Sequence, residues 1–331
     1  MHWYWDWTLF AQFTIIGLSS GALIALIALG YTLVYGIIEL INFAHGEVFM
    51  MGAMFTVTLV GVTQVDRDSS TLLILLVLLL ALIASMAFAG LLNAGIDWVA
   101  YKRLRNSPRL APLIAAIGMS FILQNLAIYW KGSNPIPVPD LIPSKWRSYN
   151  VLKEWPVLRD WFADSTLRLR IPDLFVIGVT IPLLILLSWF VYRTRTGTAM
   201  RATAQDREAA ALMGIDINWT IGVAFMLGGA LAGAAGMIAL FYNQSARFQM
   251  GFQYGLFAFT AAVLGGIGNL PGAVVGGFII GLIWSYSDGY MGNFVDGWGS
   301  QWTNSVIFAI LILVLVFKPS GLFGTHTVEK V

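Results

Sequence analysis

A group of polar side chains interrupts an otherwise apolar stretch near residue 45. Residues 41–47 read INFAHGE, which brings Asn42, His45 and Glu47 together around Gly46. Ionisable groups at membrane depth are costly and usually functional, so His45 and Glu47 could bind a metal or relay a proton. Two ligands are too few for a closed metal site, and we predict none. Three alternatives remain: a proton relay, a gating role in a substrate path, and a structural role at a helix break. In the structural role Asn42 caps the next helix, Gly46 allows the turn and His45 satisfies freed backbone groups.

A second break lies in the long apolar stretch 254–287. Residues 265–272 read GGIGNLPG, and proline with clustered glycine interrupts a helix. We predict two short helices that form a hairpin or a discontinuous pair. Backbone groups at broken membrane helices often contact substrate, so Gly265, Gly266, Gly268 and Asn269 join the first break as candidates for the substrate path.

The segment 201–216 reads RATAQDREAAALMGID and lies between two apolar stretches. Its composition favours a helix, Asp206 and Glu208 suit the start of that helix, and Gly214 suits its end. We predict one short amphipathic helix that either docks in a groove of a separate motor subunit or is an ordinary interfacial helix. The candidate docking residues are Gln205, Asp206, Arg207, Glu208, Ala209, Ala210, Leu212 and Gly214.

Several kinds of chemistry are missing from the sequence. It has no cysteine and no Gly-x-x-x-x-Gly-Lys-Ser/Thr loop, which excludes thiol chemistry and a P-loop for ATP. Three histidines offer little catalytic material, and no ionisable group lies in the middle of a confident span, as ion-coupled carriers need. We therefore predict no catalytic residues, no cofactor bound by this chain, and an energy source on another polypeptide.

The elements that must position these residues are membrane helices. Hydrophobic residues make up 58% of the 331 residues and charged residues only 11%, whereas soluble domains carry about 25%. In lipid, backbone N–H and C=O groups find hydrogen-bond partners only within their own helix, so each span must be helical. We predict a single all-α domain, 1–331, a polytopic bundle of about eight to nine spans. Seven are placed at 9–38, 44–64, 71–97, 111–130, 173–192, 217–242 and 302–317, and the broken pair follows 254.

Lysine and arginine in short loops predict the orientation of the bundle. The loop after the third span carries Lys102, Arg103, Arg105 and Arg109, and the coupling loop 193–216 carries four arginines, so both should be cytoplasmic. The N-terminus is then outside, and 254–287 must cross twice or re-enter. The segment 131–172 becomes an extracytoplasmic loop despite its seven basic residues.

Four stretches together resemble one known family. Gly21–Leu26 and Gly30–Gly36, followed by INFAHGE, resemble the N-terminal signature of LivH-type permeases of branched-chain amino-acid ABC importers. Residues 204–210, AQDREAA, with Gly214 and Ile215, resemble the coupling region of that family. Residues 261–273, AAVLGGIGNLPGA, resemble its Gly-rich signature, and the tail 318–324, KPSGLFG, fits as well.

The resemblance implies a multi-pass subunit in the bacterial inner membrane. It would pair with a second related permease, with two cytoplasmic ATPase subunits that use ATP and Mg²⁺, and with a periplasmic protein that delivers leucine, isoleucine or valine. No nucleic-acid partner is implied. Similar permeases handle urea, amides or other amino acids. The expected mechanism is alternating access, with helix 201–215 transmitting the motor's movement. The rival hypotheses are a secondary carrier or channel without an ATPase and a membrane-embedded enzyme using Asn42, His45 and Glu47.

Overall fold

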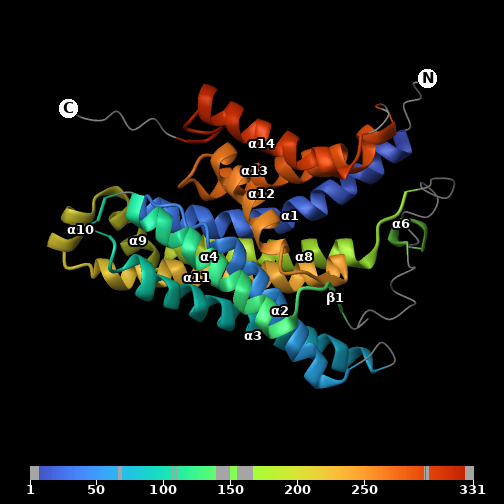
Figure 1. Cartoon of the computed structure of the whole chain (residues 1–331), viewed down its shortest axis with the longest axis horizontal. Helices are drawn as coiled ribbons and strands as arrows, with labels where there is room; N and C mark the ends of the chain where they lie inside the picture. The colour runs from blue at the N-terminus through green and yellow to red at the C-terminus, as the bar shows by residue number, and fades with distance from the viewer. Residues whose placement is uncertain are drawn as a thin grey trace.

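The computed structural model describes residues 7–65, 69–105, 107–108, 110–138, 150–154, 167–293, 295 and 298–324. It is a helical bundle with one two-residue strand pair (Figure 1). The helices are α1 (Trp7–Ile38), α2 (His45–Thr63), α3 (Thr71–Ile96), η1 (Asp97–Tyr101), α4 (Leu110–Lys131), α6 (Val151–Glu154), α8 (Ile171–Arg193), α9 (Arg195–Gln205), α10 (Arg207–Leu212), α11 (Ile217–Asn243), α12 (Met250–Gly265), α13 (Leu270–Ser285), η2 (Tyr286–Tyr290), η3 (Met291–Asn293) and α14 (Ser300–Phe317). Strands β1 (Ile136–Pro137) and β2 (Ser245–Ala246) pair antiparallel.

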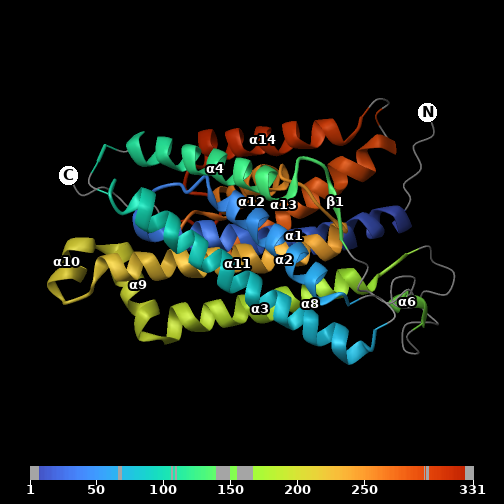
Figure 2. The ribbon, with the colours of Figure 1, turned by 60° about the horizontal axis from the view of Figure 1, so that its bottom comes forward.

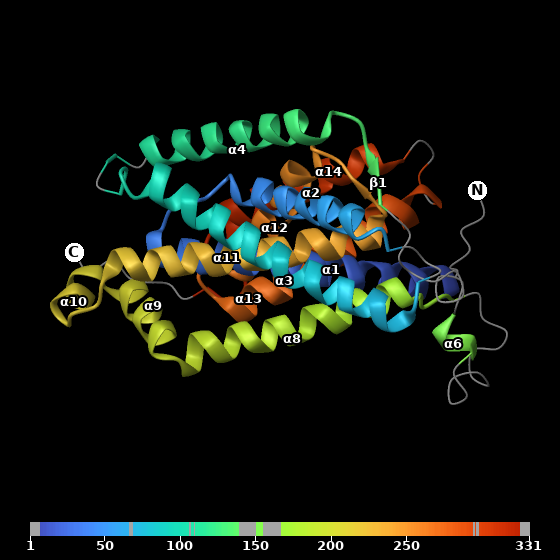
Figure 3. The same cartoon turned by 90° about the horizontal axis from the view of Figure 1, so that it is seen from below.

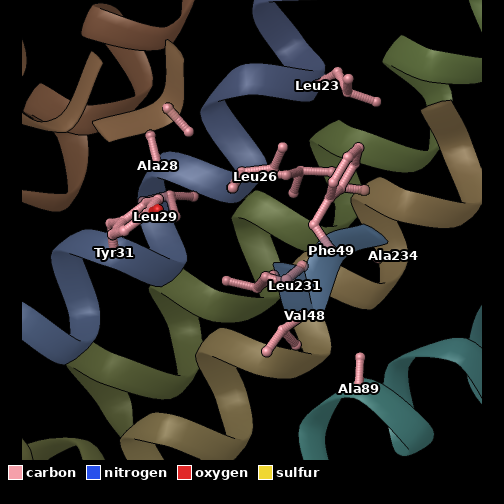
Figure 4. Close-up of a cluster of buried hydrophobic side chains, with 14 of the residues drawn as sticks. Leu23, Leu26, Ala28, Leu29, Tyr31, Val48, Phe49, Ala89, Leu231 and Ala234 are labelled. Atoms are coloured by element: carbon pink, nitrogen blue, oxygen red, sulfur yellow. The ribbon is translucent and has the colours of Figure 1, made fainter. Parts of the chain in front are cut away.

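The centre of the bundle is built from α1, α2, α11, α12 and α13. Most of α1 and α11 is buried, and Figure 4 shows Leu26, Phe49 and Leu231 from three of these helices meeting in the core. No helix of this group has one polar face, since each contacts protein on most sides. The predicted all-α bundle is therefore confirmed.

Glycines let the central helices approach to backbone contact. A Cβ added to Gly277 of α13 would lie 2.6 Å from the Cα of Ala25 in α1, and one on Gly21 would lie 2.8 Å from the Cα of Phe278. Gly233 of α11 likewise packs within reach of the Cβ of Ala89 in α3. Small residues at the contacts are how helices associate tightly in lipid, where burial of apolar surface gives little drive.

Apolar side chains cover the outer faces of α3, α4, α8 and α14. Figure 3 shows α4 and α8 on opposite flanks of the bundle. Leu79 of α3, Phe121 of α4 and Ile185 of α8 are all more than half exposed. Among the described residues, seven helices are long and apolar enough to cross a membrane, and Met250–Gly265 and Gln301–Phe317 are shorter apolar helices. With so much apolar surface facing outward, the chain is a multi-pass membrane protein.

The seven predicted spans agree with the observed helices to within two residues at each end, and the break near 266–269 is found between α12 and α13. Side-chain caps explain several boundaries. The side chain of Ser70 accepts from the Leu73 N–H, Asp216 accepts from Trp219, and Asn269 accepts from Gly272. Each satisfies an N–H that the first turn of the helix leaves unpaired.

The two ends of the bundle are formed by different elements. One end, here called the basic end, carries the η1–α4 connection with Lys102, Arg103 and Arg105, together with α9, α10 and the C-terminal segment (Figure 2). Arg109 lies outside the described residues. The N-terminal start of α1, the β1–β2 pair and α6 lie at the opposite end. The described parts of loop 131–172 are at that opposite end, as the orientation prediction requires, while 139–149 and 155–166 lie outside the description.

Candidate functional site

The first helix break joins α1 to α2 through residues 39–44. Glu39 adopts a left-handed backbone with φ of 54°, which ends α1. Asn42 then organises the turn: its Oδ1 accepts from the Ala44 N–H at 3.1 Å, and its carbonyl accepts from the His45 N–H at 3.0 Å. An asparagine that accepts from the backbone two residues ahead stabilises such turns, so α2 begins at His45.

Asn42 also belongs to a buried polar network that the sequence did not indicate. Its Nδ2 donates to Asn93 Oδ1 at 3.2 Å, and the Tyr101 hydroxyl donates to Asn42 Oδ1 at 2.9 Å. Asn93 in turn donates to the carbonyl of Phe225 at 2.7 Å. The network thus fastens the α1–α2 break to α3, η1 and α11. The only sequence signal was Asn93 itself, a polar residue near the end of an apolar span.

Replacing Asn42 with leucine should destabilise the bundle by about 2–4 kcal/mol, since it strands the buried Tyr101 hydroxyl and Asn93 amide at about 1–3 kcal/mol each. The measurement is the temperature at which the detergent-solubilised protein loses its monodisperse elution. Asn125→Leu is the matched control, because Asn125 is exposed on α4 and donates only to the carbonyl of Phe121 within its own helix. Equal thermal midpoints for the two variants would contradict the claim that the polar network around Asn42 stabilises the bundle.

His45 is fully buried at the first turn of α2. Its ring packs edge-on against Tyr31 of α1, with centroids 4.7 Å apart. Gly30 leaves the space that the imidazole fills, because any side chain there would overlap the ring. His45 of α2 thus packs against Gly30 and Tyr31 of α1, and its role in gating stays a prediction.

Glu47 is the other buried ionisable group of this segment. Its Oε1 accepts from Gln124 Nε2 at 2.7 Å and from Ser120 Oγ at 3.3 Å, both on α4. Gly251, the second residue of α12, leaves room for the carboxylate. Ser120 and Gln124 also line a cavity of about 500 Å³ with Phe43, Ile117, Phe121, Gln249 and Phe252. Their spacing of four residues on an apolar span was a usable sequence signal, because it places both on one helix face.

The structure therefore brings three of the predicted path residues, Asn42, His45 and Glu47, to the start of α2, while Gly46 packs against α12. A Cβ on Gly46 would lie 2.8 Å from the Cα of Gly255. Among the described residues no three His, Asp or Glu side chains gather in a way that could hold a metal ion. His45 contacts aromatic and backbone groups, whereas Glu47 faces the amide and hydroxyl of α4.

The predicted single helix over 201–215 is wrong in one respect: it is two helices. Asp206 ends α9 and caps α10, with its Oδ1 accepting from the Ala209 N–H at 2.9 Å. An N-cap needs an extended backbone, and Asp206 has φ of −158°, so one continuous helix cannot pass through it. Gly214, with φ of +84°, follows the end of α10 as predicted.

Most of the predicted coupling residues form an exposed tip at the basic end. Gln205, Asp206, Glu208, Ala209, Leu212 and Gly214 are exposed, Ala210 is buried, and Arg207 is half-buried. Leu212 is 88% exposed and its neighbour Met213 is 82% exposed. Two large exposed apolar side chains at the end of such a short helix suit contact with another protein or with the membrane surface.

Arg207 connects this tip to the core. Its guanidinium donates two hydrogen bonds, at 2.8 Å and 3.2 Å, to the carbonyl of Ile37 in the last turn of α1. Ile37 lies two residues before the left-handed Glu39 that begins the break. These hydrogen bonds join α10 to the last turn of α1, just before the turn that Asn42 organises.

The Gly-rich turn between α12 and α13 lies at the same end. The carbonyls of Leu264 and Gly265 accept from the N–H groups of Leu322 and Phe323, at 2.8 Å and 3.1 Å. Asn269 Nδ2 donates to the carbonyl of Phe323 at 3.0 Å. The C-terminal segment thus occupies backbone groups of the turn. That Gly265, Gly266, Gly268 and Asn269 contact substrate stays a prediction.

The turn also touches α1, since a Cβ on Gly36 would lie 3.3 Å from the Cα of Gly268. The last turn of α1 is therefore in contact with both the exposed tip and the α12–α13 turn. The two helix breaks and the tip form one continuous unit at the basic end.

Comparison with known proteins bears on what this unit does. The family model for the permease component of the branched-chain amino acid transport system matches residues 13–316. The chain belongs to this permease family. The match includes both helix breaks, the exposed tip and all of the membrane helices apart from the first residues of α1 and the last residue of α14.

Individual relatives of the permease are similar along almost their whole length. The high-affinity branched-chain amino acid transport system permease protein BraD of Pseudomonas aeruginosa is 37% identical over 328 residues, 97% of this chain and 98% of its own. The permease proteins LivH of Salmonella typhimurium and Escherichia coli are 38% and 37% identical over 327 residues, with the same coverage. No solved structure matches the chain.

Proposed function

We propose that the chain is one membrane-spanning subunit of an ATP-driven importer of branched-chain amino acids in the bacterial inner membrane. The proposal is carried by 37% identity, along 97% of this chain, to a permease protein whose name specifies high-affinity branched-chain amino acid transport. The resemblance of residues 41–47, 204–215 and 261–273 to the LivH-type signatures points the same way.

The proposed assembly contains a second related permease, two cytoplasmic ATPase subunits and a periplasmic binding protein. The exposed tip with Leu212 and Met213 supplies the contact for an ATPase subunit. Arg207 and the carbonyl of Ile37 supply the route from that contact to the α1–α2 break. ATP and Mg²⁺ act on the partner subunits, and this chain provides the moving path.

The proposed transport step is alternating access. Closure of the ATPase dimer displaces α10, and the end of α1 follows because Arg207 holds it. The α1–α2 break, fixed to α3 and α11 through Asn42 and Asn93, then changes its packing around Glu47 and α4. A switch of this kind works only if ATP binding favours one of the two arrangements over the other.

Leu212→Asp is expected to abolish ATP-driven leucine uptake by the complete complex in proteoliposomes. A carboxylate would replace an apolar side chain that a docking surface covers, and loss of a buried anchor of this kind costs about 2 kcal/mol or more. The ATPase subunits should then no longer co-purify in mild detergent. Thr198→Asp is the matched control, because it adds the same charge on exposed α9 at the same end.

Three results would contradict the proposal or one of its parts. Wild-type uptake that persists without ATP would identify a secondary carrier or channel. Wild-type uptake of urea or an amide in place of leucine would identify a relative with another substrate. Full co-purification and uptake with Leu212→Asp would show that the tip contacts no ATPase.

A further inference from the structure

A polar cavity of about 520 Å³ opens at the end of the bundle opposite the basic end. It lies where the end of α11, the start of α12, η2 and the start of α14 meet. Its described lining contains one cation, Arg247, and one anion, Asp288, surrounded by asparagine and glutamine side chains and by Tyr254 and Trp284. The volume is within the usual range for small-molecule sites, about 300–1,000 Å³.

The two opposite charges face one cavity without neutralising each other directly. Neither Arg247 nor Asp288 takes part in an ion pair among the described residues. Asp288 Oδ1 accepts only a long hydrogen bond of 3.5 Å from Thr303, and Asn243 and Tyr254 bond to each other at 2.9 Å. The pocket thus offers separated positive and negative groups held on several different elements.

This arrangement matches the charges of a free α-amino acid. A guanidinium pairs with a carboxylate through parallel N–H bonds. Arg247 also precedes α12, which starts at Met250, and the partial positive charge of a helix N-terminus adds to its attraction for an anion. Asp288 and the amide oxygens suit an ammonium group, which donates three hydrogen bonds and accepts none.

The cavity continues toward an apolar one. Gln249 lines both it and the cavity of about 500 Å³ described with Glu47, where Phe43, Ile117, Phe121 and Phe252 contribute apolar surface. Phe43 belongs to the α1–α2 break, which the exposed tip reaches through Arg207. A polar entrance followed by an apolar chamber fits a zwitterion with an aliphatic side chain.

We infer that the cavity of Arg247 and Asp288 is the entry site for zwitterionic aliphatic amino acids. Arg247 binds the carboxylate, Asp288 binds the ammonium, and the aliphatic side chain points past Gln249 toward Phe252 and Phe43. The inference rests on the proposed function for its substrate class and adds where on this chain the substrate first binds.

The test is covalent labelling of the complete complex in nanodiscs, without binding protein, by a diazirine analogue of leucine. Labelled peptides are mapped by mass spectrometry, and leucine, 4-methylvalerate and 3-methylbutylamine are used as competitors. We expect labels at Phe43, within 117–121 and within 249–252, because the diazirine lies on the aliphatic side chain, which points into the apolar cavity. Leucine should compete about tenfold better than either truncated compound, because each lacks one charged contact worth at least a factor of ten. Arg247→Gln and Asp288→Asn should each lower labelling by a similar factor.

Arg168→Gln is the matched control, since Arg168 is exposed at the same end of the bundle and outside the cavity, and it should label like wild type. Labels elsewhere, equal competition by all three compounds, or unchanged labelling in both cavity variants would overturn the inference. If the two cavity variants captured the binding protein more weakly but were labelled like wild type, the inference would also be overturned, because Arg247 and Asp288 would then contact that protein and not the amino acid. Leucine uptake by the wild-type complex is measured separately: its absence would refute the proposed function, while the labelling still decides the entry site.

Discussion

Replacing Arg207 with alanine is expected to lower ATP-driven leucine uptake by about tenfold or more while the ATPase subunits still bind and still hydrolyse ATP. The guanidinium is the polar link from α10 to the end of α1, with two hydrogen bonds to the Ile37 carbonyl. Hydrogen bonds from a charged group contribute about 1.5–3 kcal/mol, which corresponds to a factor of about 10–100 in an equilibrium. Without them, movement of the tip no longer displaces the α1–α2 break.

The measurement compares uptake and ATPase rate in the same proteoliposomes. Arg201→Ala is the control, because Arg201 lies on α9 at the same end and stacks on Tyr192 instead of bonding to α1. Arg207→Lys should recover part of the uptake, since one ammonium can donate to the same carbonyl. Wild-type uptake by Arg207→Ala would show that the link carries no movement. If Arg207→Ala no longer bound the ATPase subunits, Arg207 would be a docking residue and would not be the residue that transmits movement.

Replacing Gly277 with leucine should prevent stable folding of the bundle. Even the first carbon of a side chain would lie 2.6 Å from the Cα of Ala25, and that neighbour is backbone that cannot rotate away. Overpacking costs about 1–3 kcal/mol where side chains can adjust, and more where helices must separate. Because α1 contacts α13 along much of its length, the central bundle would lose its closest interface.

The result is read as the yield of monodisperse protein and its thermal midpoint in detergent, which should fall by about 5 °C or more if any folded protein remains. Gly178→Leu is the matched control. Gly178 is exposed in the middle of α8, and no atom lies within 4 Å of an added Cβ. It should fold normally, since leucine favours the helix more than glycine does. Equal behaviour of the two variants would contradict the claim that α1 and α13 meet through their backbones.

Apolar length and capping residues determined the helices of this protein. A run such as 71–96 has no alternative in lipid, because only a helix pairs all of its backbone groups internally. Ser70, Asp216 and Asn269 mark helix starts through local hydrogen bonds that need no knowledge of the rest of the fold. Gly214 ends α10 for the same local reason. Asp206 carried a local signal as well, but its capping role competes with helix continuation, and the prediction chose continuation.

The tertiary structure alone decided which distant residues meet. Arg207 and Ile37 are 170 residues apart, and Gln124 and Glu47 are 77 apart. The polar cavity draws Arg247 and Asp288 from either side of the α12–α13 hairpin. Composition and periodicity describe one helix at a time, whereas these contacts depend on how the helices pack against one another. Small residues such as Gly277 and Gly30 permit two helices to pack closely at one register, and bulky residues prevent it elsewhere. The sequence by itself therefore determined the spans, the breaks and the exposed tip, and the packing of helix against helix decided how the tip, the breaks and the cavity are joined.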